Sequence, residues 1–217
     1  APQEFQRLRA LGLNGDEQRA VGRRDRDSNT AEFLGGERDL DRPLRQLAHD
    51  LGHLAHCLEQ LDLAAGSLSS PNEVEMAIWF HDVINEPGQP DNEARSADYF
   101  GKVADGKMAA DFIERVVDLI LVTTHRDAPL DADQRFICDI DLASFGCPWE
   151  CFMRDTSAVK AEFTGPMEDY YRGKKAFLEH MLQRPRIFLT DFFNSRYEQQ
   201  SRDNIRQLLT LLEQRAD

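Results

Sequence analysis

Apolar residues recur at spacings of three and four along most of the chain. Between Leu40 and Leu63 they occupy positions 47, 51, 54, 58 and 61, which is the period of one helix face. Comparable patterns cover about 73–84, 92–100, 109–124, 131–145, 148–163, 167–182 and 190–215. No segment alternates convincingly as a strand would, and no internal repeat is visible. The pattern predicts an all-α fold.

The start of one helix is marked by three residues before an apolar stretch. Ser70 can cap the helix, Pro71 suits its first turn, and Glu73 completes a capping box. This helix should continue to about Asp82 or Ile84 and end in the Pro- and Gly-containing loop 85–90.

The first 40 residues fit the helical pattern least well. They include an uninterrupted charged run at 23–27 and the pair Gly35-Gly36. We expect a peripheral or irregular segment over 1–40, followed by one helical domain over 41–217.

The net charge limits the kinds of molecule that the chain is expected to bind. With 26 Lys and Arg against 39 Asp and Glu, the formal charge is −13, whereas proteins that bind nucleic-acid polymers or anionic membranes normally present a basic face. No apolar run reaches the ~20 residues of a membrane span, and the first residues lack the layout of a signal peptide. We expect a cytoplasmic protein whose four cysteines are reduced.

Histidine and aspartate occupy positions that the helical period assigns to the interior. The stripe Val74, Ala77, Ile78 continues to His81, with Asp82 beside it. A buried carboxylate is costly unless it is paired or bound to a cation. A positive group should therefore lie against Asp82.

Three further helical segments repeat this pattern. His49 and His53 are four residues apart, the stripe of Val117 and Leu121 ends in His125, and Asp141 shares a face with apolar residues while Asp139 lies just off it. Each has an ordinary structural explanation when taken alone. Together they favour a shared site, and a mixed set of imidazoles and carboxylates suits Mn, Fe, Co, Ni or Zn.

An ordered series of motifs resembles the HD-domain metal-dependent phosphohydrolases, in particular a small bacterial subfamily. The resemblance covers about residues 43–210. Its matching segments are AHDLGHL (48–54), AIWFHDV (77–83), DNEARSA (91–97), DIDL (139–142), YRGKK (171–175) and RPRIFLT (184–190). The subfamily carries an aromatic residue where this chain has Ala48.

This resemblance implies an HD-like helical bundle that binds one or two divalent transition-metal ions. The implied metal ligands are His53, His81, Asp82 and Asp141, with Asp139 as the alternative to Asp141. His49 and His125 would lie close by, completing a second metal position or binding substrate.

The resemblance also implies hydrolysis of a small phosphate ester, with a nucleotide-like substrate favoured. Asp82 would bind metal and orient water. Glu93 would be an acid or base, although a solvated carboxylate at a helix N-terminus explains it equally well. His125 joins these two as a catalytic candidate, and His49 is a substrate-binding candidate.

Basic side chains are needed for the charge of the substrate. The candidates are Arg95, Arg126, Arg172 and Lys175, of which Arg172 and Lys175 lie in a matched segment, and a surface salt bridge is the alternative for each.

Two other functions remain open. One is a di-iron oxygenase that uses His49 and His125 as extra ligands. The other is a non-catalytic module that binds a nucleotide or a partner. The last predicted helix, which carries Leu208 and Leu212, is able to pack internally or in a homodimer.

Overall fold

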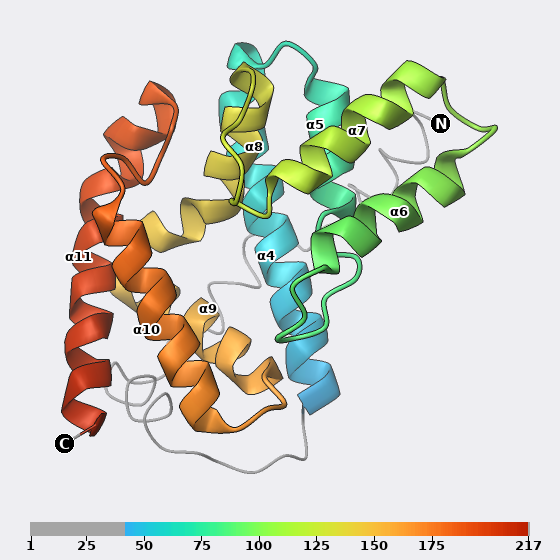
Figure 1. The fold of residues 1–217 in the computed structure, drawn as a ribbon. Helices are drawn as coiled ribbons and strands as arrows, with labels where there is room; N and C mark the ends of the chain where they lie inside the picture. The colour runs from blue at the N-terminus through green and yellow to red at the C-terminus, as the bar shows by residue number, and fades with distance from the viewer. Residues whose placement is uncertain (1–41, 217) are drawn as a thin grey trace.

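The computed structural model describes residues 42–216, with side chains from 52 to 215 (Figure 1). This part of the chain contains eight α-helices, two short 3-10 helices and no strand, so the all-α prediction is confirmed. The HD-like bundle stays a prediction, and the predicted segment 1–40 lies outside the described residues. The elements are α4 (Arg42–Ala64), η1 (Ala65–Ser67), α5 (Pro71–Phe80), α6 (Asn92–Ala104), α7 (Ala110–Val122), α8 (Ala132–Asp141), η2 (Leu142–Gly146), α9 (Trp149–Glu162), α10 (Met167–Gln183) and α11 (Asp191–Ala216).

Helix α4 lies at the centre of the described fold. It contacts α5, α8 and α9, while α6 packs on α7 and α10 packs on α11 (Figure 1). Large side chains that are almost completely buried, including Phe100, Leu119, Ile137, Phe188 and Phe193, come from elements on both sides of α4. Burial of a side chain of this size contributes about 1.5–3 kcal/mol. None of the described helices combines the length and apolar character that crossing a bilayer would require.

Helix α5 begins at Pro71, but the predicted cap at Ser70 is wrong. The Ser70 side chain makes no capping hydrogen bond. Instead, the backbone N–H groups of Ser69 and Ser70 each donate to a carboxylate oxygen of Asp133 at 2.9 Å. A buried carboxylate from α8 therefore accepts from the N–H of Ser70, the role that the predicted capping box gave to Glu73.

The predicted end of α5 is also later than the observed one. The helix ends at Phe80, and His81 and Asp82 lie in the turn that follows. The His81 N–H still donates to Ala77 O at 2.8 Å, so the last turn remains closed. The chain turns away directly after it, which leaves the Asp82 side chain 46% exposed at the edge of the core.

Helices α7 and α8 are joined by a side-chain cap. Asp131 accepts a hydrogen bond from Gln134 N at 3.0 Å and receives both terminal nitrogens of Arg115, at 2.7 and 3.0 Å. The hydrogen-bonded Arg115 lowers the pKa of Asp131. This bidentate pair fixes the start of α8 against α7.

Two glycines should respond oppositely to alanine. A Cβ added at Gly146 in η2 would lie 2.4 Å from Tyr197 Cβ, whereas one at Gly101, inside α6, meets no atom within 4 Å. We expect Gly146→Ala to lower the free energy of unfolding by about 1–3 kcal/mol through overpacking. Gly101→Ala should raise it by about 0.5–1 kcal/mol through helix propensity. Urea denaturation of both variants tests this, and a shift of the same sign in both would contradict it.

Candidate metal centre

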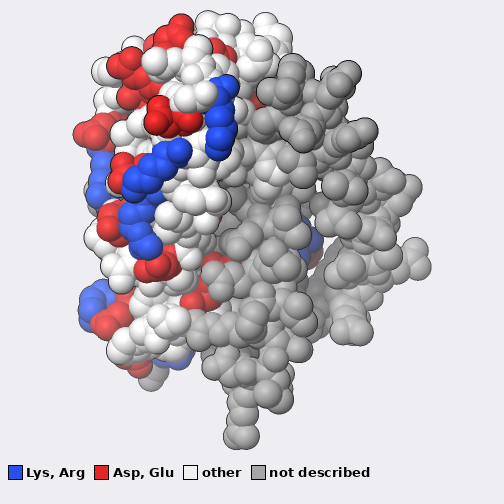
Figure 2. All heavy atoms as spheres, turned by 90° about the vertical axis from the view of Figure 1, so that its right-hand side faces the viewer, with Lys and Arg blue, Asp and Glu red and all other residues white. Residues whose placement is uncertain are grey.

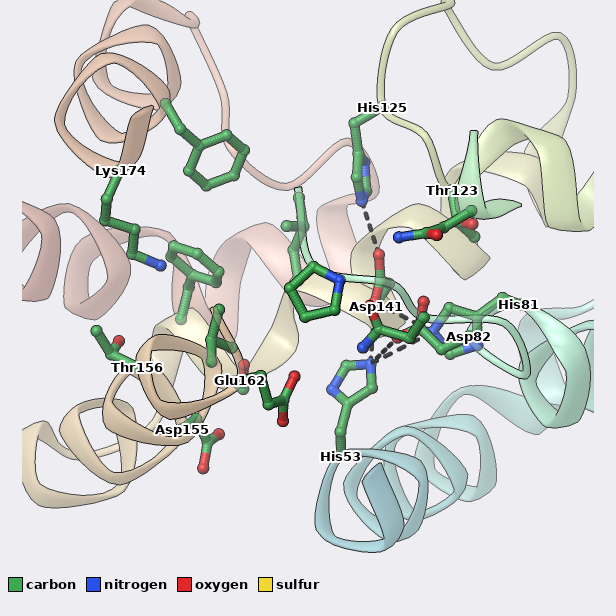
Figure 3. A pocket seen from close by; sticks show the side chains of 18 of the residues that line it. His53, His81, Asp82, Thr123, His125, Asp141, Asp155, Thr156, Glu162 and Lys174 are labelled. Atoms are coloured by element: carbon green, nitrogen blue, oxygen red, sulfur yellow. Dashed lines mark hydrogen bonds and ion pairs between the residues drawn. The ribbon is translucent and has the colours of Figure 1, made fainter. Parts of the chain in front are cut away.

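Side chains from three parts of the fold converge on one point. His53 extends from α4, His81 and Asp82 from the turn after α5, and Asp141 from the last residue of α8 (Figure 3). His53 Nε2 lies 3.3 Å from His81 Nε2 and 3.2 Å from Asp141 Oδ1. Asp82 Oδ2 lies 3.4 Å from His81 Nε2 and 3.8 Å from His53 Nε2. His81 Nε2 completes the set at 3.5 Å from Asp141 Oδ1.

These separations match the edges of a coordination polyhedron. Ligand atoms placed tetrahedrally at about 2.1 Å from a divalent ion are about 3.4 Å apart. The five distances run from 3.2 to 3.8 Å. His53, His81 and Asp82 form one group able to hold a metal ion, and Asp141 adjoins this group through its contacts with both histidines. The donor set and its spacing therefore fit a transition-metal ion such as Zn, Mn, Fe, Co or Ni.

The His81 ring is oriented for a ligand role. Its Nδ1 lies 2.9 Å from Ile78 O, and because a carbonyl only accepts, Nδ1 carries the proton. With a metal ion bound, the neutral ring would direct the lone pair of Nε2 into the cluster. Burial lowers the pKa of His81, but the carboxylates of Asp82 and Asp141 outweigh it and raise the pKa to about 10. The surroundings of Nε2 thus favour a positive charge there.

Asp141 connects this cluster to His125. His125 Nε2 donates to Asp141 Oδ2 at 2.8 Å, on the side away from the His53 contact. Burial raises the pKa of Asp141, but the hydrogen bonds from His125, His53 and His81 hold it well below its usual range. Asp141 is therefore ionised and shared between the cluster and His125.

The backbone of His125 is strained. Its φ is 55°, in the left-handed region that costs a non-glycine residue about 1–2 kcal/mol. Its N–H donates to Val122 O at 3.1 Å, which closes a turn directly after α7. Strain of this kind is typical of functional positions, and here it turns the imidazole towards Asp141.

Cys57 is a neighbour of the cluster that the sequence analysis did not identify. Its Sγ lies 3.5 Å from His53 Nε2, and His53, Cys57 and Asp141 form a second group able to hold a metal ion. The signal was present in the sequence, since Cys57 follows His53 by four residues on the same helix.

Asp139 does not belong to the centre. It is fully buried and accepts hydrogen bonds from Leu189 N at 2.7 Å, from Thr190 N at 2.7 Å and from Thr190 Oγ1 at 2.6 Å. Both of its oxygens are thus used to hold the segment before α11. Of the two alternative carboxylates in the sequence, Asp141 is the one at the cluster.

A cavity of about 470 Å³ opens beside the cluster. Glu93 is among its lining residues, and His125 lines it beside Asp141. Helices α9 and α10 contribute Asp155, Glu162 and Lys174, of which Lys174 lies on the side away from the cluster (Figure 3). Its size is that of a pocket for a small molecule.

Two of the predicted substrate-binding arginines lie outside this cavity. Arg95 pairs with Glu86 at 2.7 Å, and Arg126 donates to Pro90 O at 2.8 Å. Neither is among the described residues that line the cavity. The side chain of His49, another predicted contact, is outside the described residues.

The basic residues of α10 are distributed differently from the prediction. Arg172 is bound to Asp169, and Lys175 lies 3.5 Å from Glu213, both on the surface and away from the cavity. Lys174, which the sequence analysis passed over, is the single Lys or Arg among the described residues that line the cavity. The sequence could have predicted the inward position of Lys174, because Lys174 follows the buried Tyr170 by four residues and so lies on the same face of the helix.

Lys174 should make stability depend on pH in the alkaline range. Burial lowers its pKa from the usual 10.5 to about 8, so the unfolded chain binds more protons than the folded one between these values. The free energy of unfolding should then rise with pH across this window, relative to that of Lys174→Met. Urea denaturation of both proteins at several pH values tests this, and parallel pH profiles would contradict it.

Comparison with known proteins gives no match. No family model matches the chain, and neither a curated protein nor a solved structure is significantly similar to it. The case for a function therefore depends on the residues of the site.

Proposed function

We propose that this chain is a metal-dependent phosphohydrolase that cleaves a small phosphate ester, with an HD-like helical bundle as its fold. The observation that carries the proposal is the convergence of His53, His81, Asp82 and Asp141 at metal-ligand spacing beside a small-molecule cavity. The motif series resembling HD-domain phosphohydrolases supports the same chemistry. The proposed cofactor is one or two divalent ions of Mn, Fe, Co, Ni or Zn.

Such an ion would lower the pKa of a bound water and neutralise a phosphoryl oxygen. Within this chain, the Ile78 carbonyl fixes the His81 tautomer, and His125 holds the second oxygen of Asp141. Asp82, the most exposed member of the cluster, is positioned to orient the water. Glu93 lines the cavity and would protonate the leaving group.

The surroundings of the site favour a small substrate over a polymer. The cavity volume of about 470 Å³ suits one small molecule. On the face drawn in Figure 2, the Lys and Arg side chains of the described residues lie among Asp and Glu, which gives a polyanion little continuous basic surface.

The test is metal analysis of the purified protein combined with hydrolysis assays. We expect bound transition metal and turnover, with added Mn²⁺, of at least one member of a panel of nucleotides and simple phosphate monoesters. Absence of both metal and turnover would overturn the proposal and favour a binding module. Bound iron with an oxygen-dependent spectral change and no hydrolysis would favour the di-iron oxygenase.

A further inference from the structure

Lys174 is a cation in the cavity that has no anionic partner among the described residues. Its side chain extends from α10 into the cavity, on the side opposite the metal centre (Figure 3). Its Nζ lies 5.7 Å from the ring centre of Phe145 and 5.9 Å from that of Phe177. No described carboxylate forms an ion pair with it, and burial is the one influence on its lowered pKa.

An ammonium group in this setting lacks part of what water would give it. The two rings offer cation–π attraction, which compensates only a fraction of the lost hydration. The lining also contains five carboxylates, from Asp82, Glu93, Asp141, Asp155 and Glu162, which repel an anionic ligand wherever a cation does not offset them. Among the described lining residues, Lys174 is thus the single Lys or Arg that could receive an anion at that end.

The lining of the cavity also contains apolar side chains. Leu142, Phe152, Val159 and Phe163 belong to its lining. A ligand that reaches from the metal centre to Lys174 would therefore place an apolar part of its structure against these side chains.

We propose that Lys174 is the specificity determinant of this site and binds a second anionic group of the substrate, at the end remote from the scissile phosphate. The inference rests on the proposed phosphohydrolase function. The substrate class is a phosphate monoester whose apolar body ends in a carboxylate or a second phosphate.

The test compares substrates that differ only at the far end. Linear ω-carboxyalkyl phosphates, α,ω-bisphosphates and unsubstituted alkyl phosphates of increasing chain length are assayed with added Mn²⁺. For the two series that carry an anionic group at the far end, we expect kcat/KM to pass through a maximum as the chain length increases. At that length it should exceed the value for the matching alkyl phosphate by about 10- to 100-fold, as expected for a charged hydrogen bond. The carboxylate and bisphosphate series then distinguish the two sources of the anion.

Three variants test whether the preference for substrates with an anionic far end depends on Lys174. Lys174→Met should reduce the preference to about one, chiefly through KM, and Lys174→Arg should keep most of it. Lys102→Met, which removes an exposed lysine of α6 outside the cavity lining, should retain the wild-type preference. A wild-type enzyme that hydrolyses all series equally, or a preference that survives in Lys174→Met, would overturn the inference and leave the proposed function intact.

Failure of the proposed function gives a different result. If the wild type hydrolyses none of these esters, the ω-carboxyalkyl phosphates serve as ligands in a titration of ¹³C-labelled lysines followed by NMR. The Lys174 signal is assigned by its loss in Lys174→Met. A rise of its pKa on ligand addition would support the anion site, and an unchanged pKa would overturn it.

Discussion

Replacement of Asp141 by asparagine should abolish stoichiometric metal binding and lower the rate of phosphate-ester hydrolysis by more than about 100-fold, the upper range seen when groups that only support a ligand are removed. Asparagine keeps the shape of the side chain but removes its charge. Asp141 Oδ1 lies 3.2 Å from His53 Nε2, and Oδ2 accepts from His125 at 2.8 Å. In the amide, an NH₂ group replaces one of the two carboxylate oxygens, so the side chain loses either its metal-facing oxygen or the acceptor for His125.

The measurements are metal content after dialysis and kcat/KM on the best substrate of the panel. Asp118→Asn is the matched control, because it removes a carboxylate from the exposed face of α7 and should retain metal and activity. Thermal unfolding of both variants shows whether the fold is preserved. A folded Asp141→Asn protein with wild-type metal content and activity would exclude this residue from the site.

The second large effect concerns stability. Asp139→Asn should lower the free energy of unfolding by about 2–4 kcal/mol, since it leaves buried donors without acceptors. Asp139 is completely buried, and its two oxygens accept from Leu189 N and from the N–H and hydroxyl of Thr190. The NH₂ group of asparagine would face one of these donors.

Urea denaturation measures this effect, and metal content of the folded variant provides the contrast. Below the unfolding transition, Asp139→Asn should bind metal as the wild type does, whereas Asp141→Asn should not. Thr190→Val, which removes one of the three donors, should be destabilised less than Asp139→Asn. Loss of metal by Asp139→Asn while it remains folded would mean that the two carboxylates share one role.

The helices were predictable because their apolar faces follow a local period. Segments 167–182 and 190–215 agree with α10 and α11 to within about two residues, the usual uncertainty of helix ends. The cap of α5 was not predictable, because the acceptor for Ser69 and Ser70 is Asp133, which is more than 60 residues away in the sequence.

In the candidate site, too, the sequence could not predict which distant residues each side chain would contact. The helical period placed several His and Asp residues in the interior, and the resemblance to HD-domain proteins then implied His53, His81, Asp82 and Asp141 as ligands. The structure brings these four side chains close together. Spacing could not separate Asp139 from Asp141, because what distinguishes them is the partner each one meets. The matched motif led to Lys175 as a candidate and not to Lys174. Neighbouring residues on a helix point about 100° apart, and of these two only Lys174 lines the cavity.

The two ends of the cavity are built by different parts of the chain. The metal end comes from α4, the turn after α5 and α8, whereas Lys174, Asp155 and Glu162 come from α9 and α10. Substitutions on α9 and α10 can therefore change the lining of the cavity without altering His53, His81, Asp82 or Asp141. If the proposed function holds, this division would let one metal cluster acquire new substrates in evolution, and it would make these two helices the segment to randomise when a different specificity is wanted.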